Sequence, residues 1–168
     1  MRANTDDTIT IRPATRDDVP LVLEFIRGLA RYERLEHEVS TSETELRETL
    51  FGERPYAEVV FACSGSEPLG FALFFHNFST FKGQPGIYLE DLFVLPEARG
   101  RGIGRRLLVH LARAAVERRC ARLEWAVLDW NEPSIGFYRS LGAVPMDEWT
   151  TFRLTGDALK SLAGSAAA

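Results

Sequence analysis

The sequence predicts one α/β domain built around a mixed sheet, and three observations support this prediction. The chain has 168 residues, a length that suits a single domain with a substantial core. Its composition, 45% hydrophobic and 26% charged, is that of an ordinary folded protein. Helical and strand-like periodicity alternate along the chain without an internal repeat or an interdomain linker. We therefore expect one domain over residues 1–168, frayed at 1–7 and 163–168.

The first part of the chain is predicted to form one strand and two helices. Residues 8–12 alternate β-branched and polar side chains, which is typical of a short strand. Thr15 is a candidate N-cap, and apolar residues at helical spacing follow it to about Tyr32. A second helix is expected to begin at one of the hydroxyl residues 41–42 and to end in the segment 51–55, which contains glycine and proline.

The middle of the chain is predicted to form strands over residues 58–63, 69–76 and 87–95. Turn-forming residues rich in glycine separate these strands. A loop of glycine and arginine at 96–104 then leads into a helix that extends to about residue 119.

The last part of the chain is predicted to contribute a strand, a helix and a further strand. Residues 123–128 have strand character. Asn131 is a strong N-cap because Pro133 follows in the first turn, and the helix is expected to end at Gly142. Residues 149–154 are expected to form the final strand.

Charge, cysteine content and hydropathy argue against several classes of protein. A net charge of -4 does not favour binding to nucleic-acid phosphates. Cys63 and Cys120 are far apart in the sequence and the three histidines are scattered, so we expect neither a metal site nor a disulfide framework. Two free thiols are typical of a protein in the reducing cytoplasm. No apolar run approaches the ~20 residues of a membrane helix, and the first residues do not resemble a signal peptide.

The most specific local feature is the glycine-rich loop between a predicted strand and a predicted helix. Its residues are Arg99, Gly100, Arg101, Gly102, Ile103 and Gly104. Glycines let the backbone turn tightly and bring its N–H groups close to an anion, and the next helix directs its positive end to the same place. This order of elements predicts a phosphate site, near which the arginines 99, 101, 105 and 106 cluster.

Alternatives for this loop are weaker but not all are removed. A nucleotide P-loop would require Lys and Ser or Thr after Gly104, where Arg105 and Arg106 stand. A dinucleotide fingerprint would require glycine in place of Arg105. A nucleic-acid site is disfavoured because no stacking aromatic residue lies among the arginines. Taken alone, the loop is also compatible with a glycine-rich turn that ends the strand and binds no ligand. At least one of the arginines is expected only to be exposed to solvent.

The loop matches the pyrophosphate-binding signature Arg/Gln-x-x-Gly-x-Gly/Ala of the GNAT acetyltransferases, and residues 131–143 resemble the second motif of that superfamily. Further stretches resemble its diamine branch, which comprises the spermidine/spermine and thialysine acetyltransferases. These stretches are residues 11–15, 29–33, 88–91 and 130–134. The resemblance extends over about residues 9–155.

This resemblance implies the GNAT fold, in which a largely antiparallel central sheet is splayed at the cofactor cleft and carries helices on both faces. It also implies acetyl-CoA as the cofactor. The residues expected to bind acetyl-CoA are Leu92, Phe93, Val94, Arg99, Gly100, Arg101, Gly102, Ile103, Gly104, Arg105, Asn131, Ser134 and Tyr138. Capping of the helix would by itself explain Asn131.

The implied reaction is the attack of an amine on a thioester, and two catalytic residues are expected. A free alkylamine has a pKa of about 10.4, so a proton must be removed at neutral pH. Glu90 is the candidate base, acting through a water as in the resembled family, with an electrostatic anchor as its alternative role. The family carries a β-bulge here that would re-aim Glu90 and Asp91. Tyr138 is the candidate acid, with a core aromatic role as its alternative.

The acceptor is expected to be a small primary amine. Candidate substrate-binding residues are Tyr32, Glu33, Glu90, Asp91 and Trp149, where acids would attract an ammonium and Tyr32 would offer a cation–π face. Their alternatives are a solvated helix end and, for the tryptophan, a place in the core. The segment 79–83 resembles the thialysine acetyltransferases rather than the polyamine enzymes, which favours a compact, lysine-like amine over spermine.

Other functions stay open at this point. A polyamine acetyltransferase and a protein or peptide acetyltransferase would use the same scaffold. A non-catalytic acyl-CoA-binding sensor belongs to another class, and Glu90 and Tyr138 argue against it. The resemblance further implies a homodimer, and we expect a cytoplasmic protein with no nucleic-acid or membrane partner.

Overall fold

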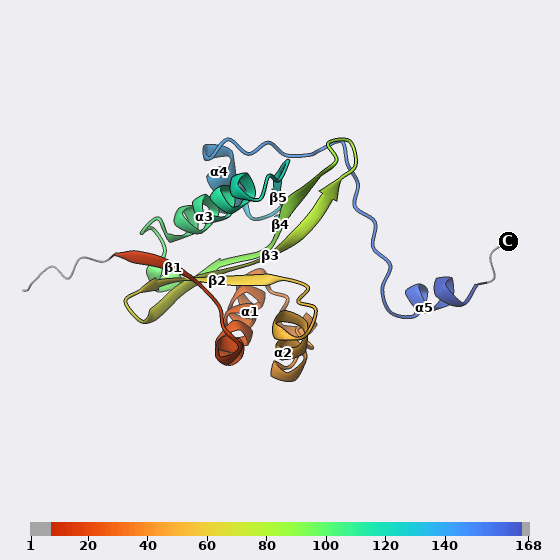
Figure 1. Cartoon of the computed structure of the whole chain (residues 1–168), viewed down its shortest axis with the longest axis horizontal. Coiled ribbons are helices and arrows are strands. Elements are labelled where there is room, and N and C mark those ends of the chain that lie inside the picture. The colour runs from red at the N-terminus through yellow and green to blue at the C-terminus, as the bar shows by residue number, and fades with distance from the viewer. Residues whose placement is uncertain (1–7, 166–168) are drawn as a thin grey trace, which may run out of the picture. The chain divides into compact units, whose positions relative to one another are not determined.

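A five-stranded mixed sheet in the order β1-β2-β3-β4-β5 is the largest element of the computed structural model, which describes residues 8–165 (Figure 1). Neighbouring strands from β1 to β4 are antiparallel, and β5 is parallel to β4. The strands are β1 (Ile9–Pro13), β2 (Glu58–Ser64), β3 (Glu67–Ser79), β4 (Gln84–Val94) and β5 (Leu123–Trp125). The mixed sheet that the sequence predicts and the largely antiparallel arrangement that the resemblance implies are therefore confirmed.

The chain divides after Ala126 into two compact units, and the sheet belongs to the first. Helices α1 (Val19–Glu33) and α2 (Glu43–Phe51) lie on one face of this sheet, and α3 (Ile103–Glu117) lies on the other (Figure 1). The first unit thus has the three layers that helices on both faces of a sheet produce.

Sequence signals mark the starts of the first two helices, and at α2 the signal corresponds to a side-chain cap. The Ser42 hydroxyl accepts a hydrogen bond from the Glu45 N–H at the start of α2, and the Glu45 side chain accepts one from the Ser42 N–H in return. Thr15 starts a short 3-10 helix (Arg16–Asp18) that leads directly into α1. The Asp18 carboxylate accepts a hydrogen bond from the Thr15 N–H, but neither Thr15 nor Asp18 caps the following turn with its side chain, so of these two helices only α2 has a side-chain cap.

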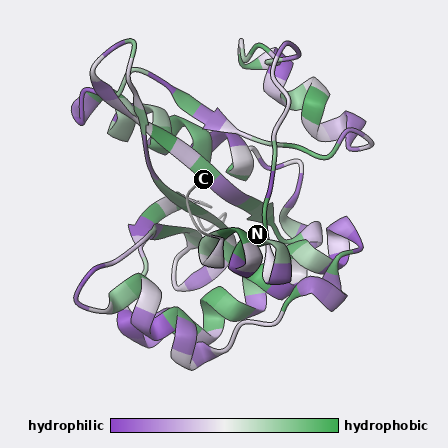
Figure 2. Cartoon of the chain, turned by 90° about the vertical axis from the view of Figure 1, so that its right-hand side faces the viewer, coloured by the Kyte–Doolittle hydropathy of each residue, from purple (hydrophilic) through white to green (hydrophobic). Residues whose placement is uncertain are grey.

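The core lies between the sheet and its helices. On the α1 side, Phe25 packs against the rings of Phe61, Phe71 and Phe93 with centroid separations of 5.4–6.2 Å. On the other side, α3 buries residues at helical spacing, which are Ile103, Leu107, Leu108, Leu111 and Ala115. Figure 2 shows hydrophobic residues along the central strands, as expected for a sheet covered on both faces.

The second unit contains α4 (Glu132–Ser140) and α5 (Gly156–Gly164). Helix α4 starts after Asn131 as predicted, but α5 was not predicted and includes part of the segment 163–168 that we expected to fray. The expected fraying of residues 1–7 and 166–168 lies outside the described residues. No helix in the described part of the chain combines the length and hydropathy that a membrane crossing requires.

The predicted strand at 149–154 is wrong, because these residues form neither strand nor helix. Aromatic and β-branched residues indicate only a local preference, whereas a strand also needs a neighbour for its backbone hydrogen bonds. None of the strands at 8–165 pairs with this segment. The strand predicted at 123–128 is shorter for the same reason, since its pairing with β4 ends at Trp125.

We predict that Phe71→Ala lowers the free energy of unfolding by about 3–5 kcal/mol, because Phe71 is 0% exposed and its removal leaves a cavity among three aromatic rings. Urea denaturation of the purified proteins measures this. Phe81→Ala is the matched control, because this ring is 96% exposed and its loss should change stability by less than about 0.5 kcal/mol. Equal effects of the two substitutions would contradict the position of the core.

Candidate active site

A β-bulge at Glu90 shapes the middle of β4. On β3, Leu73 and Phe74 are consecutive, yet they stand opposite Asp91 and Leu89, so Glu90 has no partner in this ladder. The structure therefore contains the bulge that the resemblance implied. A bulge re-aims the side chains around it, so that the adjacent acids need not point to opposite faces of the sheet.

The strand β4 loses its second neighbour at the same place. Pairing between β4 and β5 covers Ile87 to Leu89 and stops immediately before the bulge. From Glu90 to Val94, the edge of β4 on the β5 side has no strand partner within the described residues. This is the expected splay, and it leaves the backbone of residues 92–94 at an open strand edge, where N–H groups can serve a ligand.

Three carboxylates meet beside the bulge, and they come from two different elements. Glu33 is the last residue of α1, whereas Glu90 and Asp91 belong to β4. Burial, followed by the negative charges of Glu90 and Glu33, raises the pKa of Asp91 to about 7. Burial also raises the pKa of Glu33. We name these three residues the carboxylate cluster; a cation placed beside it would favour the ionised acids and relieve their mutual repulsion.

The glycine-rich loop has the backbone conformation that its sequence indicated. Gly100 and Gly102 have φ angles of 78° and 74°, and a Cβ at either position would meet no atom within 4 Å. Gly102 is also the N-cap of α3, so no side chain caps the first N–H groups of this 15-residue helix. An open backbone cradle with uncapped helical N–H groups fits an anionic phosphate.

Arg99 connects this loop to α1. Its Nε donates a hydrogen bond to the carbonyl oxygen of Val94 at 3.1 Å, and its guanidinium lies 4.6 Å from the ring centroid of Tyr32 and 5.6 Å from that of Phe93. The structure thus brings together two residues that were expected to have separate roles, Arg99 with the cofactor and Tyr32 with the acceptor.

The other expected cofactor residues of the first unit occupy varied positions. Arg101 and Arg105 are exposed around the start of α3, where their charges lie close to the loop. Ile103 is buried in the core at 2% exposure, so only its backbone could contact a ligand. Leu92 and Val94 are partly buried on β4, while the Phe93 side chain packs toward α1.

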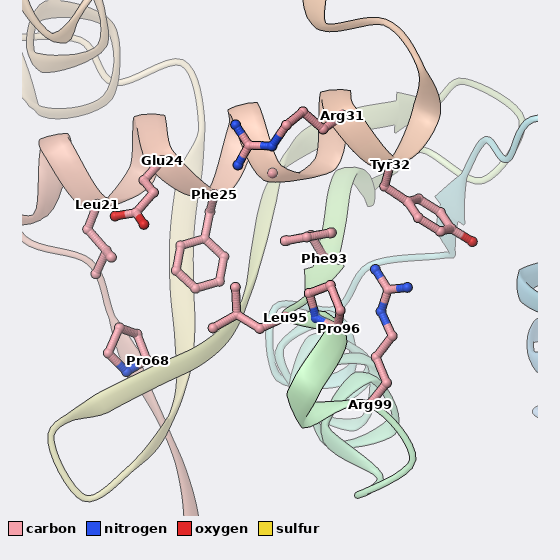
Figure 3. Close-up of a pocket in the computed structure, with 11 residues that line it drawn as sticks. Leu21, Glu24, Phe25, Arg31, Tyr32, Pro68, Phe93, Leu95, Pro96 and Arg99 are labelled. Atoms are coloured by element: carbon pink, nitrogen blue, oxygen red, sulfur yellow. The ribbon is translucent and has the colours of Figure 1, made fainter.

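A groove of about 510 Å³ follows α1 beside the ends of β3 and β4 (Figure 3). We name it the α1 groove. Its apolar walls are Leu21, Phe25, Pro68, Phe93, Leu95 and Pro96. Its polar residues are Glu24, Arg31, Tyr32 and Arg99. Glu24 and Arg31 were not among the residues predicted from the sequence. Their separation of seven residues, which places both on one face of α1, could have indicated them.

The remaining expected residues belong to the second unit. The Asn131 Oδ1 accepts a hydrogen bond from the Ser134 N–H at 3.4 Å, so Asn131 caps α4. Ser134 and Tyr138 are four residues apart and lie on the same side of α4. The Tyr138 ring packs against Phe137 with a centroid separation of 5.4 Å. Trp149 lies in the irregular segment between α4 and α5.

Comparison with known proteins identifies the class that this fold and site define. The acetyltransferase (GNAT) family model matches residues 24–143, which is most of the chain, and the protein belongs to this family of acetyltransferases. The resemblance stated from the sequence motifs is thereby confirmed.

Individual relatives narrow the resemblance. Thialysine N-epsilon-acetyltransferase of Bos taurus is 40% identical over 167 residues, covering 93% of this chain and 98% of that protein. L-Ornithine N5-acetyltransferase of Arabidopsis thaliana is 34% identical, and the match covers 90% of this chain and 86% of that protein. Among solved structures, an integron cassette protein from the mobile metagenome of V. cholerae is 31% identical with a TM-score of 0.79, covering 94% of this chain and 98% of that one.

We predict that Asp91→Asn stabilises the protein more at pH 8 than at pH 5. The folded Asp91 has a pKa of about 7 against an ordinary 3.8, so the folded state holds a proton that the unfolded chain releases. Stability is therefore lost as pH rises from about 4 to 7, and a neutral amide escapes this loss. At about 1.36 kcal/mol per pKa unit, the gain should be roughly 2–4 kcal/mol at pH 8 and at most about half as much at pH 5.

Urea unfolding at the two pH values measures this difference. The exposed Asp17→Asn serves as the control, because its effect should be small and similar at both pH values. A gain at position 91 that does not depend on pH would show that this carboxylate ionises normally.

Proposed function

We propose that the protein transfers an acetyl group from acetyl-CoA to the distal primary amine of a small amino acid of the thialysine or lysine type, or of a diamine. The observation that carries this proposal is the carboxylate cluster of Glu33, Glu90 and Asp91 beside the open edge of β4. Such a cluster favours a cationic acceptor, and its position beside the bulge suits an attack that occurs along this edge.

The coenzyme would be held mainly through its phosphates. Backbone N–H groups of residues 100–104 and of the first turn of α3 would donate to the pyrophosphate, and Arg101 and Arg105 would add positive charge. From the second unit, Asn131, Ser134 and Tyr138 are the expected contacts. When bound, acetyl-CoA supplies an activated thioester carbonyl and a thiol leaving group.

Deprotonation of the incoming ammonium would be the task of the carboxylates in the bulge. Glu90 is exposed and is the proposed base, taking the proton through an intervening water. Asp91 has a pKa of about 7 and so exchanges protons readily at neutral pH, which suits it to share this proton with Glu90. Glu33 would attract the ammonium before it loses the proton, and Tyr32, whose ring already carries the Arg99 guanidinium, would line the approach to it.

Charge that develops at the reacting carbonyl would be met by backbone N–H groups of residues 92–94 on the open edge of β4. The hydroxyl of Tyr138 would donate a proton to the departing sulfur. A thiol has a pKa of about 8.5 and a phenol one of about 10, so a weak acid is sufficient for this step.

The relatives support an amino-acid acceptor with a distal amine, because thialysine and L-ornithine acetyltransferases both resemble this chain over most of its length. Trp149 is proposed near the acceptor, as the resemblance implied. We further propose that the two units act together as one catalytic domain. The homodimer and the cytoplasmic location stay predictions.

We predict that Gly102→Ala weakens binding of coenzyme A by about tenfold or more, measured by calorimetry. A φ of 74° is unfavourable for alanine by about 1–2 kcal/mol, and relaxation of this strain would move the N–H groups of the loop. Gly65→Ala is the matched control, because this glycine also has a positive φ, 58°, and open surroundings, but in the turn between β2 and β3. Its coenzyme affinity should not change; equal losses in both variants would argue against a phosphate site at the loop.

We predict that the purified protein releases thiol from acetyl-CoA in the presence of thialysine, lysine or ornithine, and less efficiently with spermine. Tyr138→Phe should lower kcat about 10²-fold, because it removes the proposed acid and keeps the ring. Tyr56→Phe, at a tyrosine that is 78% exposed in the first unit, should leave kcat unchanged.

The amine panel also separates the alternatives. Efficient spermine turnover without activity on thialysine would contradict the proposed acceptor. If no amine is acetylated while calorimetry still detects binding of acetyl-CoA, a protein acceptor or a non-catalytic sensor would be favoured instead.

A further inference from the structure

We propose that the α1 groove binds the α-amino-acid end of the acceptor, with Arg31 and Arg99 facing its carboxylate and Glu24 facing its α-ammonium. This inference rests on the proposed function and adds a specificity site to it. The groove would make the enzyme select diamino acids over diamines and polyamines, which have a distal amine but no carboxylate.

The position of the groove connects it to the carboxylate cluster. Tyr32 lines the groove, and the next residue on α1 is Glu33 of the cluster. Phe93 forms a wall of the groove and follows Asp91 by two residues on β4. A single extended molecule could therefore place one end in the groove and its other end at the cluster, where acetyl transfer is proposed.

The chemistry of the walls suits the body of such a molecule. Six apolar residues form the walls, and a volume of about 510 Å³ lies within the range of small-molecule sites. The methylene or thioether chain of the acceptor would pack against this surface and so be removed from contact with water. The charged groups at the amino-acid end of the acceptor need partners of opposite charge.

The two arginines are placed to supply those partners for a carboxylate. Their side chains lie on either side of the Phe93 ring in Figure 3. Arg99 is held in place, because its Nε donates a hydrogen bond to the Val94 carbonyl oxygen and its guanidinium lies over the Tyr32 ring, which leaves its terminal nitrogens to meet an anion. A guanidinium held in this way loses little side-chain entropy when it binds a carboxylate.

Arg31 is the more adaptable partner. Its ion pair with Glu36 spans 3.4 Å between side chains that are 56% and 58% exposed, and pairs of this kind contribute little. In Figure 3 its side chain runs back along α1, toward the part of the groove that holds Glu24. Arg31 and Glu24 thus offer opposite charges along the same stretch of the groove, as the zwitterionic head of an amino acid requires.

The test compares Arg31→Gln with wild type on lysine or thialysine and on 1,5-diaminopentane, which resembles lysine without its carboxylate. We expect the KM for the amino acid to rise about 10–100-fold, the range for losing a charged hydrogen bond, while kcat changes little. The KM values for the diamine and for acetyl-CoA should not change. Arg27→Gln is the matched control, because Arg27 is an exposed arginine on the same helix and does not line the groove.

Three outcomes would overturn the proposal. An unchanged KM for the amino acid, or an equal rise for the amino acid and the diamine, would show that Arg31 does not recognise the carboxylate. A rise in the KM for acetyl-CoA would assign the groove to the coenzyme instead.

Failure of the proposed function would give a different result, namely no turnover of any amine by wild type. Calorimetric titration of lysine then decides the inference by itself. Binding to wild type and to Arg27→Gln that is lost in Arg31→Gln would support the groove as an amino-acid site, and no binding to wild type would reject it.

Discussion

The bulge at Glu90 is the constraint on which the rest of the proposed site depends. Inserting one unpaired residue into β4 shifts its register against β3 and bends the strand. The pairing with β5 ends immediately before this residue, so the open edge of β4 begins at the bulge. Asp91 follows directly after the bulge, where burial, followed by the negative charges of Glu90 and Glu33, raises its pKa to about 7. One local irregularity therefore coincides with both the strand edge for the reacting carbonyl and the acids proposed for the amine.

Arg99 makes the second connection that the site needs, between the phosphate loop and the end of α1. Its hydrogen bond to Val94 fixes the direction in which the chain leaves β4, and its stacking on Tyr32 ties that exit to the helix that ends in Glu33. The Arg99 guanidinium thus lies close to the rings of both Tyr32 on α1 and Phe93 on β4.

Much of this arrangement could be predicted from the sequence where the signal is local. Helix α2 begins at Ser42 because Glu45 completes its capping box, and the loop at Gly100 and Gly102 has the positive φ angles that glycine permits. Features that depend on pairing were less accessible. The adjacent acids of β4 do not reveal which residue lacks a partner on β3, so the bulge could be predicted only from the family resemblance. Residues 149–154 include the aromatic and β-branched residues that strands favour, yet none of the described strands pairs with them, and pairing decides that structure.

Electrostatics at the end of α1 support the proposal that the carboxylate cluster serves binding rather than stability. The C-terminal end of a helix carries partial negative charge, and Glu33 adds a carboxylate in its last turn, where a basic residue would be favourable. Burial beside Asp91 makes this arrangement costlier still, as the raised pKa of both groups shows. A fold that keeps such repulsion gives up stability in the free protein. A bound ammonium would remove this repulsion. The free energy by which the repulsion destabilises the free protein would then strengthen the binding of a cationic acceptor.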